Sequence, residues 1–76
     1  MIIKILGSGC KKCQALGENA RAAAEAAGLK AEVVKVTDVA EIAGYGIMST
    51  PGLVIDERLV ASGRVLSAAE ITKLLP

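Results

Sequence analysis

A long helical pattern between two short runs of β-branched residues constrains the fold of this chain more than any other feature. Residues 2–6 (IIKIL) and 31–36 (AEVVKV) are typical of strands, because β-branched side chains favour a pleated sheet. Between them, from about residue 10 to 27, apolar residues recur at steps of three and four, which indicates an amphipathic helix. The residues of this stripe are Cys13, Leu16, Ala20, Ala24 and Ala27. Two strands joined by such a helix predict a parallel βαβ unit with a right-handed crossover.

The middle of the sequence predicts a short helix and then an antiparallel hairpin. Asp38 has the features of an N-cap, with Glu41 three residues later, for a helix that ends at the glycines around Tyr45. Residues 52–55 (GLVI) and 59–61 (LVA) are two short apolar runs separated by Asp-Glu-Arg. Such closely spaced strands are typical of a hairpin.

The end of the sequence predicts a third helix, because Ser67-Ala-Ala-Glu70 is a capping box. Its candidate inward-facing residues are Ile71, Leu74 and Leu75. The predicted order of elements is therefore βαβαββα. We expect an α/β fold in which residues 1–76 form one domain, with a mixed four-stranded sheet and helices on both faces.

Composition and charge exclude several classes of function. Nine basic and eight acidic residues are spread along the chain, and Tyr45 is the only aromatic residue, so nucleic acid is not expected as a partner. Histidine, the usual general base and the commonest zinc ligand, is absent. The opening MIIKIL run is too short for a signal peptide or a membrane span. We expect a cytoplasmic protein that binds no membrane, in a compartment where thiols are kept reduced.

Both cysteines of the chain, Cys10 and Cys13, lie in the segment CKKC between the first predicted strand and helix. Two thiols at this spacing can bind a soft metal, close a loop or exchange electrons. A disulfide between residues three apart closes a very small loop and would stabilise the fold little. A structural zinc site needs about four ligands, which this chain could supply only if two copies shared the metal. A redox dithiol and a soft-metal site remain open at this point.

The predicted position of CKKC favours thiolate chemistry. The amino terminus of a helix carries a partial positive charge and free N–H groups, which lower the pKa of a nearby thiol from its usual value of about 8.5. Lys11 and Lys12 either add to this effect or are ordinary solvated residues. Cys10 is expected to face water at the helix start, and Cys13 to lie one turn further in on the buried stripe. A three-residue step on a helix places the two thiols within disulfide reach.

A second segment, YGIMSTPGLVI at residues 45–55, extends this pattern. Together with CKKC and the βαβαββα order, it resembles the thioredoxin superfamily, in which a Tyr-Gly-Ile run leads into a cis-proline and then an apolar strand. The corresponding residues here are Tyr45, Gly46, Ile47 and Pro51, followed by Leu53, Val54 and Ile55. Gly63 and the helix that begins at Ser67 also match. The resemblance covers essentially the whole chain, whose size is that of the minimal, glutaredoxin-sized "redox-active disulfide" proteins of prokaryotes.

The resemblance implies roles for particular residues and partners. Cys10 would be the attacking thiol of a thiol–disulfide oxidoreductase and Cys13 the resolving thiol. The Thr50–Pro51 bond would be cis and lie against this pair, with the Thr50 backbone binding an extended substrate segment like an added strand. The predicted substrate-binding residues are Thr50, Pro51, Lys11 and Lys12.

The resemblance also implies the partners of the protein. No bound cofactor is implied. We expect a monomer that acts on a disulfide-containing protein or small molecule and receives electrons from a flavoprotein disulfide reductase or a low-mass thiol.

Two departures from the family pattern affect the mechanism. The dipeptide between the cysteines is Lys-Lys, so the redox potential and the reductant do not follow by analogy. Six residues before Cys10, where thioredoxins bury an acidic proton acceptor, this chain has Lys4. Proton transfer from Cys13 must then use another route, either water or Lys4 itself, unless Lys4 is an ordinary solvated strand residue.

The alternative function is that of a soft-metal carrier similar to the small copper chaperones. These proteins also place C-x-x-C after a first strand in a chain of about this length. They usually have Met two residues before the first cysteine, where this chain has Ser8. Their element order, βαββαβ, ends on a strand, whereas this sequence predicts a final helix.

Overall fold

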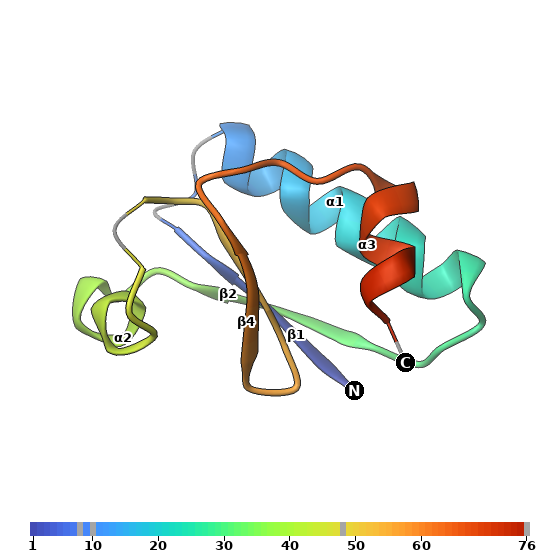
Figure 1. Ribbon diagram of the computed structural model, residues 1–76, viewed down its shortest axis with the longest axis horizontal. Coiled ribbons are helices and arrows are strands. Elements are labelled where there is room, and N and C mark those ends of the chain that lie inside the picture. Colours follow the sequence, from blue (N-terminus) through green and yellow to red (C-terminus); the bar gives the residue numbers. More distant parts are fainter. Residues whose placement is uncertain (8, 10, 48, 76) are drawn as a thin grey trace.

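A computed structural model of the chain describes every residue except 8, 10, 48 and 76. Figure 1 shows its elements in the order βαβαββα, which confirms the predicted order. The strands are β1 (Ile2–Leu6), β2 (Glu32–Val36), β3 (Gly52–Ile55) and β4 (Arg58–Ser62). The helices are α1 (Lys11–Ala26), α2 (Val39–Gly44) and α3 (Ala68–Leu74). None of these helices, within the described part of the chain, is long and apolar enough to cross a membrane.

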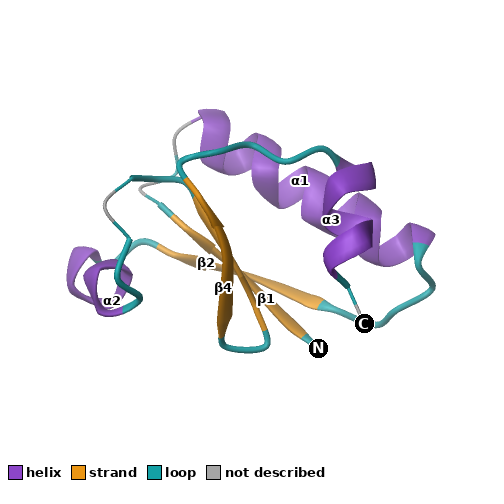
Figure 2. Cartoon of the chain, in the orientation of Figure 1, coloured by secondary structure: helices purple, strands orange, loops and turns teal. Residues whose placement is uncertain are grey.

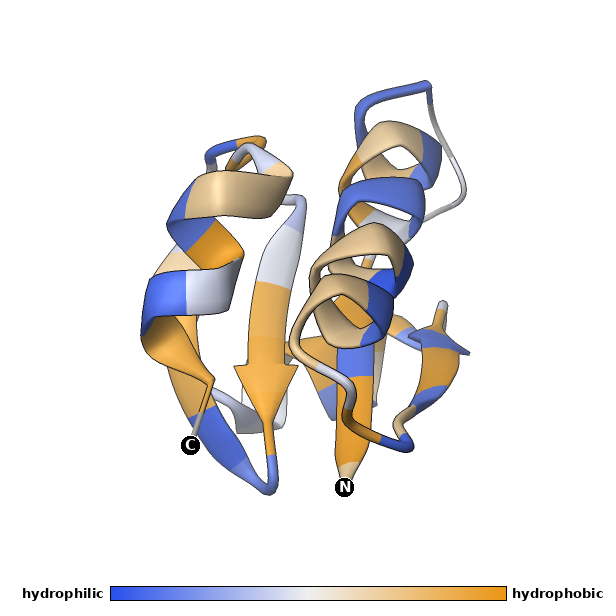
Figure 3. Ribbon diagram, turned by 90° about the vertical axis from the view of Figure 1, so that its right-hand side faces the viewer, coloured by the Kyte–Doolittle hydropathy of each residue, from blue (hydrophilic) through white to orange (hydrophobic). Residues whose placement is uncertain are grey.

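The four strands form one mixed sheet in the order β2-β1-β3-β4. Strand β1 pairs parallel with β2 and antiparallel with β3, which in turn pairs antiparallel with β4. Helices α1 and α3 lie side by side on one face of this sheet (Figures 1 and 3). Helix α2 packs through Ile42 against the core cluster on the other face. The fold is thus the predicted α/β arrangement of the thioredoxin type.

The alternation of side chains along β1 divides the core into two clusters. Ile3 and Ile5 point toward α1 and α3, whereas Leu6 points toward α2. The larger cluster comprises Ile3, Ile5, Cys13, Leu16, Ala20, Ala23, Ala24, Leu53, Ile55, Leu66 and Ile71. The smaller comprises Leu6, Val36, Ile47 and Val54. Full burial of an aliphatic side chain such as Leu16 stabilises a fold by about 1.5–3 kcal/mol, so the larger cluster carries most of the hydrophobic stabilisation.

Helix α1 lies on the sheet through a stripe of small residues, and it ends one residue earlier than the stripe predicts. Ala23 is buried, whereas Ala27 is exposed beyond the end of the helix. The reason is a Schellman motif at the carboxyl end. Gly28 adopts a positive φ of 68°, its N–H donates to the Glu25 carbonyl at 3.0 Å, and the Leu29 N–H donates to the Ala24 carbonyl at 3.0 Å. Gly28 thus ends the helix, because glycine adopts a positive φ without strain.

The hairpin between β3 and β4 has a two-residue turn rather than the three-residue connection that the sequence suggests. Asp56 and Glu57 both have positive φ, 48° and 68°, which is typical of a type I′ turn, and Arg58 already belongs to β4. Asp56 is fixed to β1, because it exchanges two 2.9 Å hydrogen bonds with the backbone of Ile2. These contacts allow the turn to form without the usual Asn-Gly or Asp-Gly pair.

Side-chain caps begin the two shorter helices. The Asp38 carboxylate accepts from the Ala40 N–H at 2.8 Å, which confirms the N-cap, although its partner is Ala40 rather than Glu41. Ser67 and Glu70 form the complete capping box, with both hydrogen bonds at 3.1 Å.

Helix α3 presents only part of its predicted apolar set to the core. Ile71 is fully buried, but Leu74 is 43% exposed, so its predicted inward position is wrong. Leu74 is the last residue of α3 and lies beside the edge strand β4. A hydrogen bond of 2.9 Å from the Asn19 side chain to the Leu66 carbonyl ties α1 to the segment that leads into α3.

Candidate active site

Three connections meet at one end of the sheet, opposite the two chain termini (Figure 2). They are the segment from β1 to α1, the segment that enters β3, and the segment that leaves β4. Helix α1 begins at Lys11, the residue that follows Cys10 in the chain. Cys10 itself lies outside the described residues, so its predicted place at the helix start remains a prediction.

Cys13 lies in the first turn of α1 and faces inward. It is only 5% exposed and belongs to the larger core cluster. A Cβ added to Gly7 would overlap the Cys13 sulfur and would lie 3.8 Å from the Thr50 Cβ. The absence of a side chain at Gly7 therefore allows Cys13 and Thr50 to approach the end of β1 together.

The segment before β3 presents Thr50 to solvent and buries Pro51. The peptide bond between them is cis, the geometry that the family resemblance implies. The Pro51 carbonyl accepts a 2.8 Å hydrogen bond from the Gly63 N–H. Gly63 has a positive φ of 69°, and a Cβ there would lie 3.0 Å from the Ser49 Cβ, so glycine permits this close contact. The end of β4 thus fixes the Thr50–Pro51 segment.

Lys11 and Lys12, the first two residues of α1, are both exposed. Within the described part of the chain, neither side chain forms a hydrogen bond or an ion pair with another described residue. Their positive charges therefore lie at the amino end of α1 without a partner among the residues that the structure describes. This position fits an effect on a thiolate at the helix start or on an approaching substrate.

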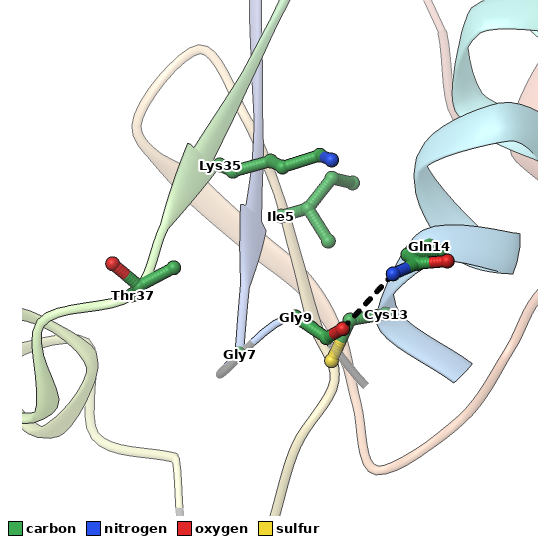
Figure 4. A pocket seen from close by; sticks show the side chains of 7 residues that line it. All are labelled: Ile5, Gly7, Gly9, Cys13, Gln14, Lys35 and Thr37. Atoms are coloured by element: carbon green, nitrogen blue, oxygen red, sulfur yellow. Dashed lines mark hydrogen bonds between the residues drawn. The ribbon is translucent and has the colours of Figure 1, made fainter. Parts of the chain in front are cut away.

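A small cavity of about 10 Å³ lies beside Cys13, which is room for one water molecule. It is lined by Ile5, Gly7, Gly9, Cys13, Gln14, Lys35 and Thr37 (Figure 4). The Gln14 side chain donates a 3.1 Å hydrogen bond to the Gly9 carbonyl and so connects the loop before α1 to the helix.

Lys4 does not lie near Cys13, because it projects from the opposite face of β1. The residue of β1 that shares the cavity with Cys13 is its neighbour, Ile5. The residue six positions before Cys10 therefore lies on the face of the strand that points away from Cys13. The prediction that Lys4 could accept the Cys13 proton is wrong. The sequence pattern could have shown this, since Ile3 and Ile5 alternate with Lys4 and must point toward the buried helix.

Lys4 is not a simply solvated residue either. Its ammonium group donates to Tyr45 Oη at 3.0 Å and to Glu57 Oε1 at 2.5 Å, and the Tyr45 hydroxyl also donates to Glu57 Oε2 at 3.4 Å. The hydrogen bond to Glu57 and then the one to Tyr45 raise the pKa of Lys4 above its ordinary value. The same contact with Lys4 lowers the pKa of Glu57. This network joins β1 to the hairpin turn and to the end of α2, on the face of β1 opposite to Cys13.

The described residues contain no group of three or more histidine, cysteine, aspartate or glutamate side chains that could hold a metal ion. The element order also differs from that of the copper carriers, since β2 is followed by helix α2 rather than by a strand.

A helix that begins at a C-x-x-C segment, over a mixed sheet and beside a cis-proline loop, defines a thioredoxin-like redox protein. Comparison with known proteins agrees, because residues 1–76 match the family described as Thioredoxin domain. The chain is 44% identical over 75 residues to a thioredoxin of Methanocaldococcus jannaschii, covering 99% of this chain and 86% of that protein. It is 43% identical over 75 residues to a thioredoxin of Methanothermobacter thermautotrophicus, covering 99% and 97%. The chain belongs to the thioredoxin family and is a thiol–disulfide oxidoreductase.

Proposed function

We propose that this protein reduces the disulfides of proteins or low-mass compounds through a dithiol formed by Cys10 and Cys13. Cys10 is the attacking thiol and Cys13 the resolving thiol. The observation that carries this assignment is the burial of Cys13, which is 5% exposed and packed against Gly7. A thiol in that position is shielded from a substrate in solution, but it is close in the chain to a thiol at the helix start.

The reaction has two exchange steps that balance in atoms and electrons. The Cys10 thiolate attacks one sulfur of the substrate disulfide, and the other sulfur leaves as a thiolate that takes a proton from solvent. Cys13 then loses its proton and attacks the Cys10 sulfur, which releases the second substrate thiolate. The substrate gains two electrons, and the protein gains a Cys10–Cys13 disulfide.

The exposed Thr50 is the proposed docking point for an extended substrate segment, which would pair with its backbone as an added strand. Pro51 holds this backbone beside Gly7 and Cys13 through the hydrogen bond between its carbonyl and Gly63. Lys11 and Lys12, the first two residues of α1, complete the proposed substrate-binding surface. Their charges favour substrates that carry acidic residues next to the disulfide.

The pKa of the Cys10 thiol is proposed to lie below the free-cysteine value, because the amino end of α1 and two adjacent ammonium groups favour a thiolate. Replacing both Lys11 and Lys12 by alanine should raise this pKa, as followed by thiolate absorbance against pH. An unchanged value would mean that the two lysines do not tune the thiol.

We further propose that residues 1–76 act as one domain and as a monomer in the cytoplasm, with no bound cofactor. A flavoprotein disulfide reductase or a low-mass thiol would return the protein to the dithiol state.

The test of the proposed function is a free-thiol count of the purified protein across a series of redox buffers. We expect the number of free thiols to change cooperatively between two and none. Variants in which either cysteine is replaced should show no such change. A protein that keeps two free thiols at every potential would contradict the proposal. In that event, tight stoichiometric copper(I) binding by the reduced monomer would support the soft-metal carrier instead.

A further inference from the structure

A groove that the thiol chemistry does not use runs between the edge strand β4 and helix α3. Two adjoining hollows form it, one of about 390 Å³ beside the hairpin turn and one of about 360 Å³ beside the segment that leads into α3. Val60 of β4 and Leu74 of α3 line both hollows, so the two are continuous. Each has the volume of a pocket that accommodates several side chains.

The floor of the groove is apolar. Ile55 and Leu66 are buried at its base, and Val60 and Ala61 are partly buried along β4. Leu74, at the end of α3, is 43% exposed and faces the same space. An exposed leucine over an apolar floor gains free energy when another apolar group covers it, so the groove can bind apolar side chains.

The strand that borders the groove carries a β-bulge. The pairing of β3 with β4 shifts between Leu53 and Val54, which leaves Val60 as an extra residue of β4. Both Val60 and its neighbour Ala61 therefore pack against the core cluster on the α3 side. A bulge interrupts the regular edge that a second copy of β4 would need for pairing, which favours a different occupant for the groove.

The charges along the groove indicate what that occupant carries. The charged lining residues are Asp56, Arg58, Arg64, Glu70 and Lys73. Both carboxylates are engaged with the backbone of the protein itself. Asp56 accepts a 2.9 Å hydrogen bond from the Ile2 N–H, and Glu70 accepts one of 3.1 Å from the Ser67 N–H.

The three cations are much less engaged than the carboxylates. Arg58 and Lys73 form no hydrogen bond or ion pair with another described residue. Arg64 forms a 3.5 Å ion pair with Glu70, but their side chains are 68% and 51% exposed, and such exposed pairs are weak. The groove therefore presents positive charge beside an apolar floor, which is complementary to an acidic segment with apolar side chains.

One end of the groove lies at the rim of the active site. Arg64, which lines the groove, directly follows Gly63, and the Gly63 N–H donates to the Pro51 carbonyl at 2.8 Å. A polypeptide segment bound at Thr50 can therefore continue past Gly63 into the groove.

We propose that the groove between β4 and α3 is a docking site for an acidic segment of a protein partner. Apolar side chains of this segment enter the groove, and its carboxylates meet Arg58, Arg64 and Lys73. The partner is a protein that exchanges disulfides at the active site, so the inference rests on the proposed function. Docking raises the effective concentration of the partner's disulfide at the site and favours protein partners over low-mass disulfides.

The test uses the full chain and two fluorescein-labelled peptides of about eight residues, which in extended form span the length of β4. One peptide alternates glutamate with leucine, and the other alternates lysine with leucine. Neither contains cysteine, so fluorescence anisotropy measures binding without any thiol exchange. We expect the acidic peptide to bind and the basic peptide not to bind, and we expect binding to weaken as the salt concentration rises.

Variants of the lining residues locate the binding site. Arg58→Gln combined with Lys73→Gln should weaken binding of the acidic peptide roughly three- to ten-fold, because two exposed charge pairs are lost. Leu74→Ala should also weaken it, because the floor loses an apolar side chain. Lys30→Gln, at an exposed lysine just before the other edge strand, is the matched control and should bind as the parent does. Circular dichroism establishes that each variant is folded.

A variant of the active-site lysines separates the groove from the helix start. Lys11→Gln combined with Lys12→Gln should leave binding of the acidic peptide unchanged. Loss of binding in this variant and not in the Arg58 and Lys73 variant would overturn the proposal. Absence of binding by the parent, or equal binding of the acidic and basic peptides, would also overturn it. A dimer in sedimentation equilibrium that the Arg58 and Lys73 variant dissociates would mean that a second copy occupies the groove instead.

A kinetic measurement connects the groove to disulfide reduction. A chromogenic aromatic disulfide is attached to the acidic peptide through a flexible glycine-serine linker and compared with the same disulfide alone. The parent should show a KM several-fold lower for the linked compound, and the Arg58 and Lys73 variant should lose this difference while reducing the free disulfide at the parent rate. Equal KM values for the two compounds in the parent would contradict docking. Peptide binding without reduction of either compound would instead contradict the proposed function, so the two failures are distinguishable.

Discussion

The Cys13 sulfur occupies the space that a side chain at Gly7 would need. This contact joins the residue that follows β1 to the first turn of α1. It also places the buried thiol beside Thr50, whose Cβ approaches the same point to 3.8 Å. Gly7 therefore fixes the depth at which Cys13 lies below the surface.

Replacing Gly7 by alanine should displace Cys13 and weaken the site. The added methyl group overlaps the sulfur, and overpacking of this kind destabilises a core by about 1–3 kcal/mol. Disulfide reduction should fall together with the midpoint of denaturant unfolding. The matched control is Gly17→Ala within α1, where the new Cβ would make an ordinary 3.8 Å contact with Ile5 Cγ1. That change should stabilise the protein by about 0.5–1 kcal/mol, and a loss of stability equal to that of Gly7→Ala would contradict this account of the contact.

The network of Lys4, Tyr45 and Glu57 should make stability depend on pH in the acidic range. The hydrogen bond from Lys4 lowers the pKa of Glu57 in the folded protein below the ordinary value of 4.5. A carboxylate with a lowered pKa contributes stability that is present above the unfolded value and is lost as pH falls through the folded one. The unfolding midpoint of the parent should therefore fall more steeply below about pH 4.5 than that of Glu57→Gln.

Glu25→Gln, at an exposed position of α1, is the control for this pH series, and its profile should follow that of the parent. If Glu57→Gln also followed the parent at every pH, the contact between Lys4 and Glu57 would contribute nothing to folding.

At alkaline pH the same network should make stability fall as pH rises. The raised pKa of Lys4 contributes stability that is present below 10.5 and is lost as pH rises above that value.

The capping box of α3 should be measurable as a change in melting temperature. Ser67→Ala removes the hydrogen bond of 3.1 Å between the Ser67 side chain and the Glu70 N–H. Loss of an N-cap costs about 1 kcal/mol, which lowers Tm by roughly 4–8 °C in a domain of this size. Ser62→Ala, at the exposed end of β4, should change Tm little. Equal Tm values for Ser67→Ala and the parent would contradict the contribution of the cap.

The fold could be predicted from the sequence because its signals are local. The β-branched runs, the alanine stripe of α1 and the Ser67 capping box each specify an element without reference to the rest of the chain. The errors occurred where an element ends or where tertiary contacts decide. The hairpin turn comprises only Asp56 and Glu57, rather than the predicted three residues, because Asp56 binds the backbone of Ile2, a partner 54 positions away in sequence.

The site was only partly predictable for the same reason. Cys13 could be placed on the buried face of α1 from helical spacing alone. The face of β1 that meets it could not be found by counting from Cys10, because the length of the connection between strand and helix decides whether Lys4 or Ile5 points inward. Lys35 was missed altogether, since its proximity to Cys13 depends on the pairing of β2 with β1. Alternation in IIKIL was the signal that could have identified the inward residues.

The measurement that tests the central claim most directly is covalent trapping of a model disulfide by the two single-cysteine variants, followed by mass spectrometry. Cys13→Ser retains the attacking thiol and lacks the resolving one, so it should accumulate a reductant-sensitive adduct at Cys10. Cys10→Ser should form almost no adduct, because the remaining Cys13 is only 5% exposed. Circular dichroism of both variants establishes that each is folded. Equal trapping by the two variants, or trapping by Cys10→Ser alone, would contradict the roles assigned to the two cysteines.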